Sequence, residues 1–172
     1  MDDFLDINDL KNKEFSIVSR VIALFNQSGG VGKTTLTMNV GYQLATRGHR
    51  VLLVDMDPQN SLTSFMGLTS FSLNIKETIY AAVVDEKPLP IHQGLHQMDL
   101  VPANIFLSTS EMELITAIRR EDRLVNALAT ARKDYDYILL DCPPSLGILS
   151  VICLVAATDL LIPIQAEYKS VE

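Results

Sequence analysis

Residues 21–35 read VIALFNQSGGVGKTT, and this stretch decides the fold of the chain. Val21–Phe25 is a short, continuous apolar run, which is typical of a strand buried on both faces of a sheet. Glycines follow directly, and Lys33–Arg47 then has apolar residues (Leu36, Val40 and Leu44) at helical spacing before Gly48 ends the helix. A buried strand, a glycine-rich turn and a helix in this order predict the first unit of a parallel α/β sheet.

The glycine-rich turn has the composition of a phosphate-binding loop. Glycines let several backbone N–H groups approach one cluster of phosphate oxygens, and the helix that follows adds its free N–H groups and its dipole. We expect Lys33 to reach the β- and γ-phosphates, the Thr34 hydroxyl to ligate Mg²⁺, and Thr35 to hydrogen-bond the α-phosphate. Gln27 occupies the first glycine position of the common spacing GxxxxGK[ST], so the loop fits the variant GGxGKT instead. The residues predicted to bind the phosphates are Ser28, Gly29, Gly30, Val31, Gly32, Lys33, Thr34 and Thr35.

Acidic residues follow two further predicted strands. Asp55 and Asp57 come after the apolar run 51–54, and Asp141 comes after the run 137–140. An aspartate at such a strand end, beside a phosphate loop, can hold a magnesium-bound water or orient an attacking water. A strand-end aspartate can equally be a turn former or a helix cap.

The rest of the chain continues the alternation of strands and helices. The patterns predict helices at 75–84, 110–118, 122–133 and 146–156, strands at 98–101 and 160–164, a loop at 67–72, and a proline-broken segment at 87–97. This order predicts an α/β fold with a mostly parallel sheet, helices on both faces, and ligands at the carboxyl ends of the strands. We expect a polar extension at 1–19 and a single domain at 20–172.

Composition limits the classes of function. The 172 residues are 48% hydrophobic and 20% charged, with a net charge of −7, which does not favour nucleic-acid binding. Cys142 and Cys153 lack a metal-ligand spacing and lie in apolar runs, so we expect reduced thiols. Apolar runs are too short for a membrane span, and the acidic start is unlike a signal peptide. These features predict a cytoplasmic protein without a membrane partner.

Three motifs, Ser28–Thr35, Asp55–Gln59 and Tyr135–Ser145, together resemble the ParA-type partition ATPases of the ParA/MinD group, and the resemblance runs from Val21 to Glu172. It implies a P-loop NTPase of the deviant Walker type that uses ATP and Mg²⁺. In its pattern Lys33 and Asp57 are catalytic, and Thr34, Asp57 and Asp141 belong to the metal site. Residues 58–61 and 143–147 are the two switch segments that sense the γ-phosphate.

The resemblance also implies a function. Such proteins are slow ATPases that dimerise with ATP and position a plasmid, a chromosome or another large cargo, stimulated by a ParB-like or other cargo adaptor. Family members carry a further stretch beyond Tyr168, through which they bind non-specific DNA and associate with the nucleoid when ATP-bound, so the chain resembles an N-terminal portion. The wording DCPPSLG at 141–147 favours the ParA branch over the MinD branch.

The chain departs from the family at Ser28, where relatives have a lysine that touches the phosphates across the dimer interface. Lys169 follows the last predicted strand and is the candidate cation to replace it at the nucleotide; the alternative is a solvated loop residue. The carboxysome-positioning branch is similar in lacking the loop lysine, and the chain is a possible member of it.

Two other interpretations stay open or are weakened. A non-catalytic nucleotide-binding scaffold of the same fold is favoured by Ser28, whereas an iron-protein-like electron carrier needs paired cysteines that Cys142 and Cys153 do not supply. Arg119, Arg120 and Arg123 form a basic cluster that is either a solvated helix face or a DNA contact.

Overall fold

The computed structural model describes residues 19–69 and 72–166. Of the predicted polar extension at 1–19, only Ser19 lies within the described residues, so the extension remains a prediction.

A six-stranded sheet forms the centre of the described part of the chain, in the order β3-β4-β2-β5-β1-β6. The strands are β1 (Arg20–Leu24), β2 (Val51–Asp55), β3 (His92–Leu95), β4 (Met98–Val101), β5 (Tyr137–Asp141) and β6 (Asp159–Leu161). All neighbouring strands pair in parallel except β3, which runs antiparallel to β4 at one edge. The predicted mostly parallel sheet is therefore confirmed.

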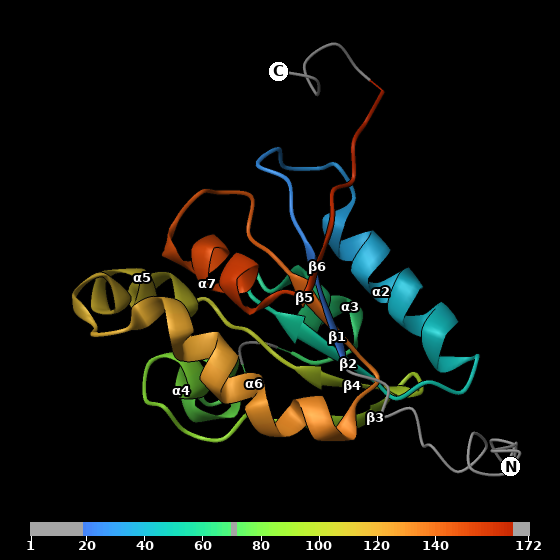
Figure 1. The fold of residues 1–172 in the computed structure, drawn as a ribbon, viewed down its shortest axis with the longest axis horizontal. Helices are drawn as coiled ribbons and strands as arrows, with labels where there is room; N and C mark the ends of the chain where they lie inside the picture. The colour runs from blue at the N-terminus through green and yellow to red at the C-terminus, as the bar shows by residue number, and fades with distance from the viewer. Residues whose placement is uncertain (1–18, 70–71, 167–172) are drawn as a thin grey trace, which may run out of the picture.

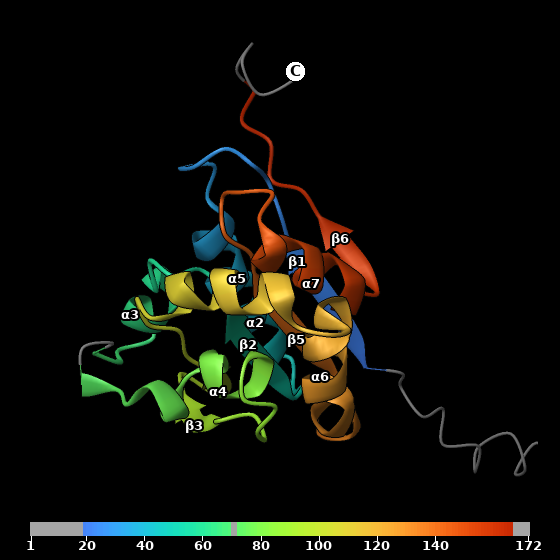
Figure 2. The ribbon, with the colours of Figure 1, turned by 90° about the vertical axis from the view of Figure 1, so that its left-hand side faces the viewer.

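Helices cover both faces of this sheet, as Figures 1 and 2 show. The helices α4, α5, α6 and α7 lie on one face, and α2 lies on the other with α3. Their bounds are α2 (Lys33–Ala45), α3 (Ser61–Phe65), α4 (Ile79–Val83), α5 (Leu107–Thr116), α6 (Arg123–Asp134) and α7 (Ile148–Ala156), with 3-10 turns η2 (Ile75–Glu77) and η3 (Arg120–Asp122).

The apolar runs of the strands supply two separate core layers. Along β2, Leu52 and Val54 pack with α4 to α7, whereas Val51 and Leu53 pack with α2 and α3. Successive side chains of a strand point to opposite faces, so a strand covered on both faces must be apolar at every position. This is why the buried strands appear in the sequence as continuous rather than alternating apolar runs.

Helix α2 packs on the sheet through its smallest side chains. Its buried positions are Lys33, Thr37, Gly41 and Ala45, four residues apart, while the predicted apolar side with Leu36, Val40 and Leu44 is only partly buried and flanks them. A Cβ atom built on Gly41 would lie 2.8 Å from Cδ2 of Leu53 and 2.9 Å from Sδ of Met98. The helix axis approaches the strands closely, so the larger apolar residues pack beside the line of contact.

Several element predictions were wrong in detail. The predicted helix at 75–84 is interrupted at Thr78, whose backbone is extended, and α3 was not predicted because the five residues at 61–65 are too short to show a period. The segment 87–97, predicted to be broken, contains β3. The hairpin to β4 turns at His96 and Gln97, whose φ angles of 51° and 68° match a two-residue turn usually made by Asn-Gly.

The other boundaries moved by a few residues. Strand β6 spans three residues rather than the predicted 160–164. Helix α5 begins three residues before the predicted 110, and α7 begins two residues after the predicted 146. Helix ends depend on local capping, which the apolar period does not locate.

The register of the sheet brings three loops to one end. Leu24, Asp55 and Asp141 are the last residues of β1, β2 and β5, and Asp141 pairs with both of the others. The loops that follow these strands lie together at the upper end of the sheet in Figure 1, beside the segment after β6. The candidate site is built at this end.

Candidate functional site

The loop between β1 and α2 has an open, glycine-lined backbone. Gly30 and Gly32 have φ angles of 77° and 90°, in the left-handed region that residues with a Cβ rarely adopt. Apart from the adjacent residues, no atom of the described part of the chain lies within 4 Å of a Cβ built on Gly29, Gly30 or Gly32. Gly32 is the N-cap of α2, so the free N–H groups of the first helical turn begin at this loop. An open cradle of backbone at a helix N-terminus suits an anion.

Lys33 is held across the loop. Its side chain is buried to 8% exposure, and Nζ donates hydrogen bonds to the carbonyl oxygens of Asn26 and Ser28, both at 3.0 Å. These bonds hold the ammonium group over the two ends of the glycine turn. The charge is thereby placed before any ligand arrives.

A hollow of about 310 Å³ opens beside this loop. The predicted site residues that line it are Gly29, Gly30, Gly32, Lys33, Thr34, Thr35 and Asp57. Ser28 is exposed outside the lining, and Val31 packs into the protein at 9% exposure. Four further residues line the hollow: Gln59, Ser61 and Pro144 belong to the predicted switch segments, and Phe65 was not predicted.

Asp141, at the end of β5, presents an unpaired carboxylate oxygen. Its side chain is almost completely buried; Oδ1 accepts a hydrogen bond from the Thr37 hydroxyl at 3.3 Å, and Oδ2 has no partner among the described residues. Burial raises the pKa of Asp141 to about 6; the nearby Thr34 hydroxyl acts to lower it, and the charge of Asp57 raises it further. A buried, uncompensated carboxylate oxygen beside a hydroxyl needs a positive partner.

These residues fit a magnesium ion bound with a nucleotide. Magnesium prefers oxygen ligands and usually takes one or two from protein side chains, filling the rest with phosphate oxygens and water. Thr34 and Asp141 are such a pair, and among residues 19–69 and 72–166 no group of three or more His, Cys, Asp or Glu side chains could hold a metal alone. A site of this kind would be completed by the ligand.

The two aspartates after β2 have different environments. Asp55 is fully buried, and its burial, followed by the charge of Asp141, raises its pKa to about 7. Asp57 lines the hollow, and its Oδ1 accepts a hydrogen bond from the Gln59 N–H at 2.9 Å, which forms a turn. Asp57 therefore shapes its own turn and also faces the hollow, which suits both the turn-forming and the water-orienting roles.

The segment after β6 is bonded to the phosphate loop. Nδ2 of Asn26 donates to the carbonyl oxygen of Pro163 at 2.8 Å, and Nε2 of Gln165 donates to the carbonyl oxygen of Gly30 at 3.2 Å. Oδ1 of Asn26 accepts the Ser28 N–H at 2.8 Å. Sequence reasoning missed Asn26 and Gln165; the available signal was that both follow predicted strands that end at the same edge. Lys169, the proposed substitute for the missing lysine, lies outside the described residues.

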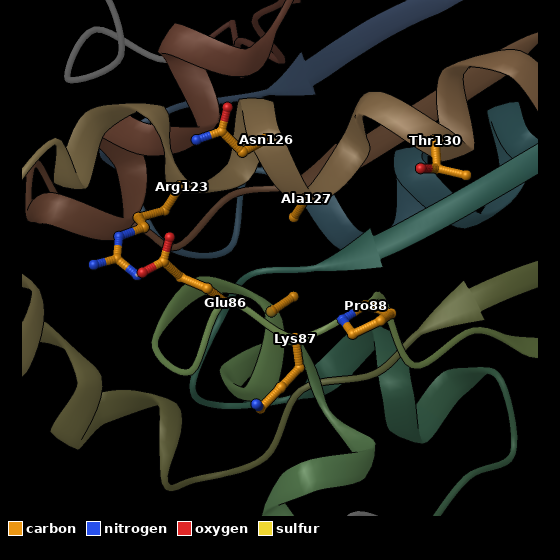
Figure 3. Close-up of a pocket in the computed structure, with 8 residues that line it drawn as sticks. Glu86, Lys87, Pro88, Arg123, Asn126, Ala127 and Thr130 are labelled. Atoms are coloured by element: carbon orange, nitrogen blue, oxygen red, sulfur yellow. The ribbon is translucent and has the colours of Figure 1, made fainter.

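The basic cluster on η3 and α6 is neutralised locally. Arg119 pairs with Asp122 at 2.9 Å, Arg120 with Glu121 at 3.1 Å and Arg123 with Glu86 at 2.7 Å. Figure 3 shows the side chains of Arg123 and Glu86 meeting at a second hollow, of about 300 Å³, between α4 and α6. The pairing favours a solvated helix face over a DNA contact.

The cysteines and the lengths of the helices bear on two further predictions, reduced thiols and the absence of a membrane span. Cys142 and Cys153 are both buried and free. None of the helices in the described residues is long and apolar enough to cross a bilayer.

The sequence of the chain was compared with those of known proteins and protein families. Residues 19–172 match the family model of the AAA domain AAA_31. The chain is 42% identical to the sporulation initiation inhibitor protein Soj of Bacillus subtilis over 158 residues, which is 90% of this chain and 62% of Soj. It is 44% identical to the chromosome partitioning protein ParA of Myxococcus xanthus over 163 residues, which is 92% of this chain and 56% of that relative.

The fold of the chain is also similar to that of a solved structure. A cobyrinic acid a,c-diamide synthase from Mycobacterium smegmatis, with bound ADP and magnesium, superposes with a TM-score of 0.84 at 38% identity and covers 89% of this chain and 64% of that one. The chain thus spans less than two thirds of the length of each of these three proteins. The chain belongs to the ParA-type partition ATPases of the AAA domain family.

Proposed function

We propose that this protein is a molecular switch that binds ATP with Mg²⁺ and hydrolyses it slowly, in order to position a plasmid, a chromosome or another large cargo. One observation carries the proposal: the glycine cradle, Lys33, Asp57 and the unpaired oxygen of Asp141 meet at one end of the sheet. Glycine N–H groups and a lysine are the partners that a triphosphate needs, and the carboxylates are those that its metal and attacking water need.

Each residue has a role that its position supports. Residues 28–35 hold the phosphates, with Lys33 neutralising charge on the β- and γ-phosphates and Thr35 reaching the α-phosphate. Thr34, Asp57 and Asp141 would hold the magnesium ion, which would supply positive charge against the charge that develops on the transferred group. Asp57, which lines the hollow, would also orient the attacking water.

The proposed cycle of ATP binding and hydrolysis is inferred from the family. ATP brings two copies of the protein together, a ParB-like or other cargo adaptor stimulates hydrolysis, and the ATP-bound form associates with non-specific DNA and hence the nucleoid of the cytoplasm. Support comes from the relatives named as chromosome partitioning and sporulation inhibitor proteins.

A non-catalytic nucleotide-binding scaffold is the second candidate. It is favoured by Ser28, which is exposed and carries no charge at the position where the family supplies a lysine. The two candidates differ in one measurement, the release of phosphate from ATP by the protein as its gene encodes it. Release above the background of a Lys33→Ala variant supports the enzyme, and release at that background supports the scaffold.

Nucleotide binding is tested with Lys33→Ala in isothermal titration calorimetry with ATP and Mg²⁺. We expect the variant to lose detectable affinity because the β- and γ-phosphates lose their main cationic partner. Lys87→Ala is the matched control, since Lys87 is exposed at the hollow between α4 and α6 and should bind ATP normally. Unchanged affinity of Lys33→Ala would refute the phosphate-loop assignment.

A further inference from the structure

Thr63 of α3 is fully buried, and its hydroxyl makes two hydrogen bonds. Its Oγ1 donates to Oδ2 of Asp55 at 2.7 Å and accepts the backbone N–H of Ala103 at 2.9 Å. Its own N–H donates to the same Asp55 oxygen at 2.9 Å. The side chains of all three residues are 0% exposed. The hydroxyl therefore joins α3, the end of β2 and the backbone after β4 in one place.

The hydrogen bonds continue from Asp55 to the candidate site. Oδ1 of Asp55 accepts the N–H of Asp57 at 3.1 Å, so the backbone of Asp57 is tied to the buried carboxylate. A hydrogen-bonded path thus runs from Asp57 through Asp55 and Thr63 to Ala103. Water cannot replace a lost partner easily in such an interior, so each bond along the path constrains the next.

The path joins two loops that also lie side by side at the surface. One is the turn of Asp57 and Gln59, and the other is the connection from β4 to α5, whose Ile105 and Phe106 are 50% and 53% exposed. A hollow of about 530 Å³ lies between the two loops, with Gln59 on one side and Phe106 on the other. A displacement of the Asp57 turn would therefore act on the β4–α5 connection from within.

We propose that Thr63 is a positioning residue that couples the Asp57 turn to the β4–α5 connection, so that the nucleotide state at Asp57 sets the conformation of residues 103–107. The inference rests on the proposed function, because it assigns the nucleotide response to that same site. Thr63 acts through Asp55 and is not among the residues that line the hollow.

The test compares Thr63→Val, which keeps the shape but loses the hydroxyl, with Thr63→Ser, which keeps the hydroxyl, in the protein as its gene encodes it. The measurements are ATP affinity, kcat, and hydrogen–deuterium exchange of residues 103–107 with and without ATP and Mg²⁺. In Thr63→Val we expect kcat to fall about tenfold, the scale of one hydrogen bond to a charged group. ATP affinity should change little, and the ATP-dependent difference in exchange at 103–107 should disappear. Thr63→Ser should restore both kcat and the exchange difference.

Thr78→Val is the matched control for the loss of a buried hydroxyl. Thr78 is also 0% exposed, and its hydroxyl donates to the carbonyl oxygen of Ile75 at 2.7 Å rather than to a residue of the path. This variant should keep the wild-type exchange difference. If Thr63→Val does not fold, Thr63→Cys takes its place, since its thiol is a much weaker hydrogen-bonding group.

The outcomes separate this inference from the proposed function. A wild-type protein that binds or hydrolyses no ATP refutes the proposed function, and the coupling with it. An active wild-type protein together with a Thr63→Val variant that keeps both kcat and the exchange difference overturns the coupling alone.

Discussion

Three aspartates in the candidate site have different surroundings, and these surroundings give each carboxylate different chemical properties. Asp55 is enclosed and bonded to Thr63, Asp141 is enclosed with one unpaired oxygen, and Asp57 lines the hollow. The sequence predicted that acids would gather here, because parallel strands end at one edge. It could not show which acid reaches the hollow, since that depends on the turn made after β2.

Asp57→Ala should still bind ATP but turn over far more slowly, because the side chain orients water rather than holding phosphate. We expect a loss of about a hundredfold or more in kcat, within the range of a positioned general base. Steady-state phosphate release and calorimetry on the same preparation measure the two properties. Unchanged turnover would leave Asp57 as the turn former that its bond to Gln59 also describes.

At the scale of elements, periodicity predicted the strands best and the short connections worst. The strands β1, β2 and β5 contain continuous apolar runs because both faces are covered, and such runs are visible in a sequence. Helix α3 and strand β3 are five and four residues long; Thr63 bonds α3 to Asp55 and Ala103, and β3 pairs with β4. The bonds of Asn26, Thr63 and Gln165 likewise have no periodic pattern in the sequence, although Asn26 and Gln165 both follow predicted strands.

The close contact of α2 with the sheet predicts the effect of Gly41→Val. The added methyl groups would meet Leu53 and Met98 where a Cβ atom alone is already at 2.8 Å and 2.9 Å. We expect a loss of about 1–3 kcal/mol in the free energy of unfolding, the usual cost of overpacking. Urea denaturation followed by circular dichroism measures it, with Gln43→Val on the exposed side of α2 as the control. Equal stability of the two variants would contradict the close approach.

At the scale of the whole molecule, charge is the dominant property. The net charge is −7, and Arg119, Arg120 and Arg123 pair with carboxylates of the same chain. The overall α/β architecture followed from the alternation of elements, and the ParA-type membership followed from three short motifs in their order. Neither inference depends on how the surface side chains are arranged, which the sequence pattern does not predict.

The isolated 172-residue chain should bind DNA poorly at physiological salt. Binding to DNA rests largely on lysines and arginines that neutralise phosphates, and the net charge of this chain is −7. A mobility-shift assay with ATP and Mg²⁺ over a range of salt concentrations measures it. Tight, ATP-dependent binding by this chain would show that a DNA surface lies within these residues.

The bonds between the phosphate loop and the segment after β6 have a consequence for synthesis on the ribosome. The loop is among the first parts of the described chain to be made, yet Asn26 and Gly30 have partners at Pro163 and Gln165. Strand β1 likewise pairs with β5 and β6, its two neighbours in the sheet, which are synthesised much later than β1. Contacts so distant in sequence form late, because the intervening chain must first emerge. A nascent chain therefore exposes its glycine loop without these partners until residues 159–165 have been made, and the loop gains its final shape only when they have left the exit tunnel.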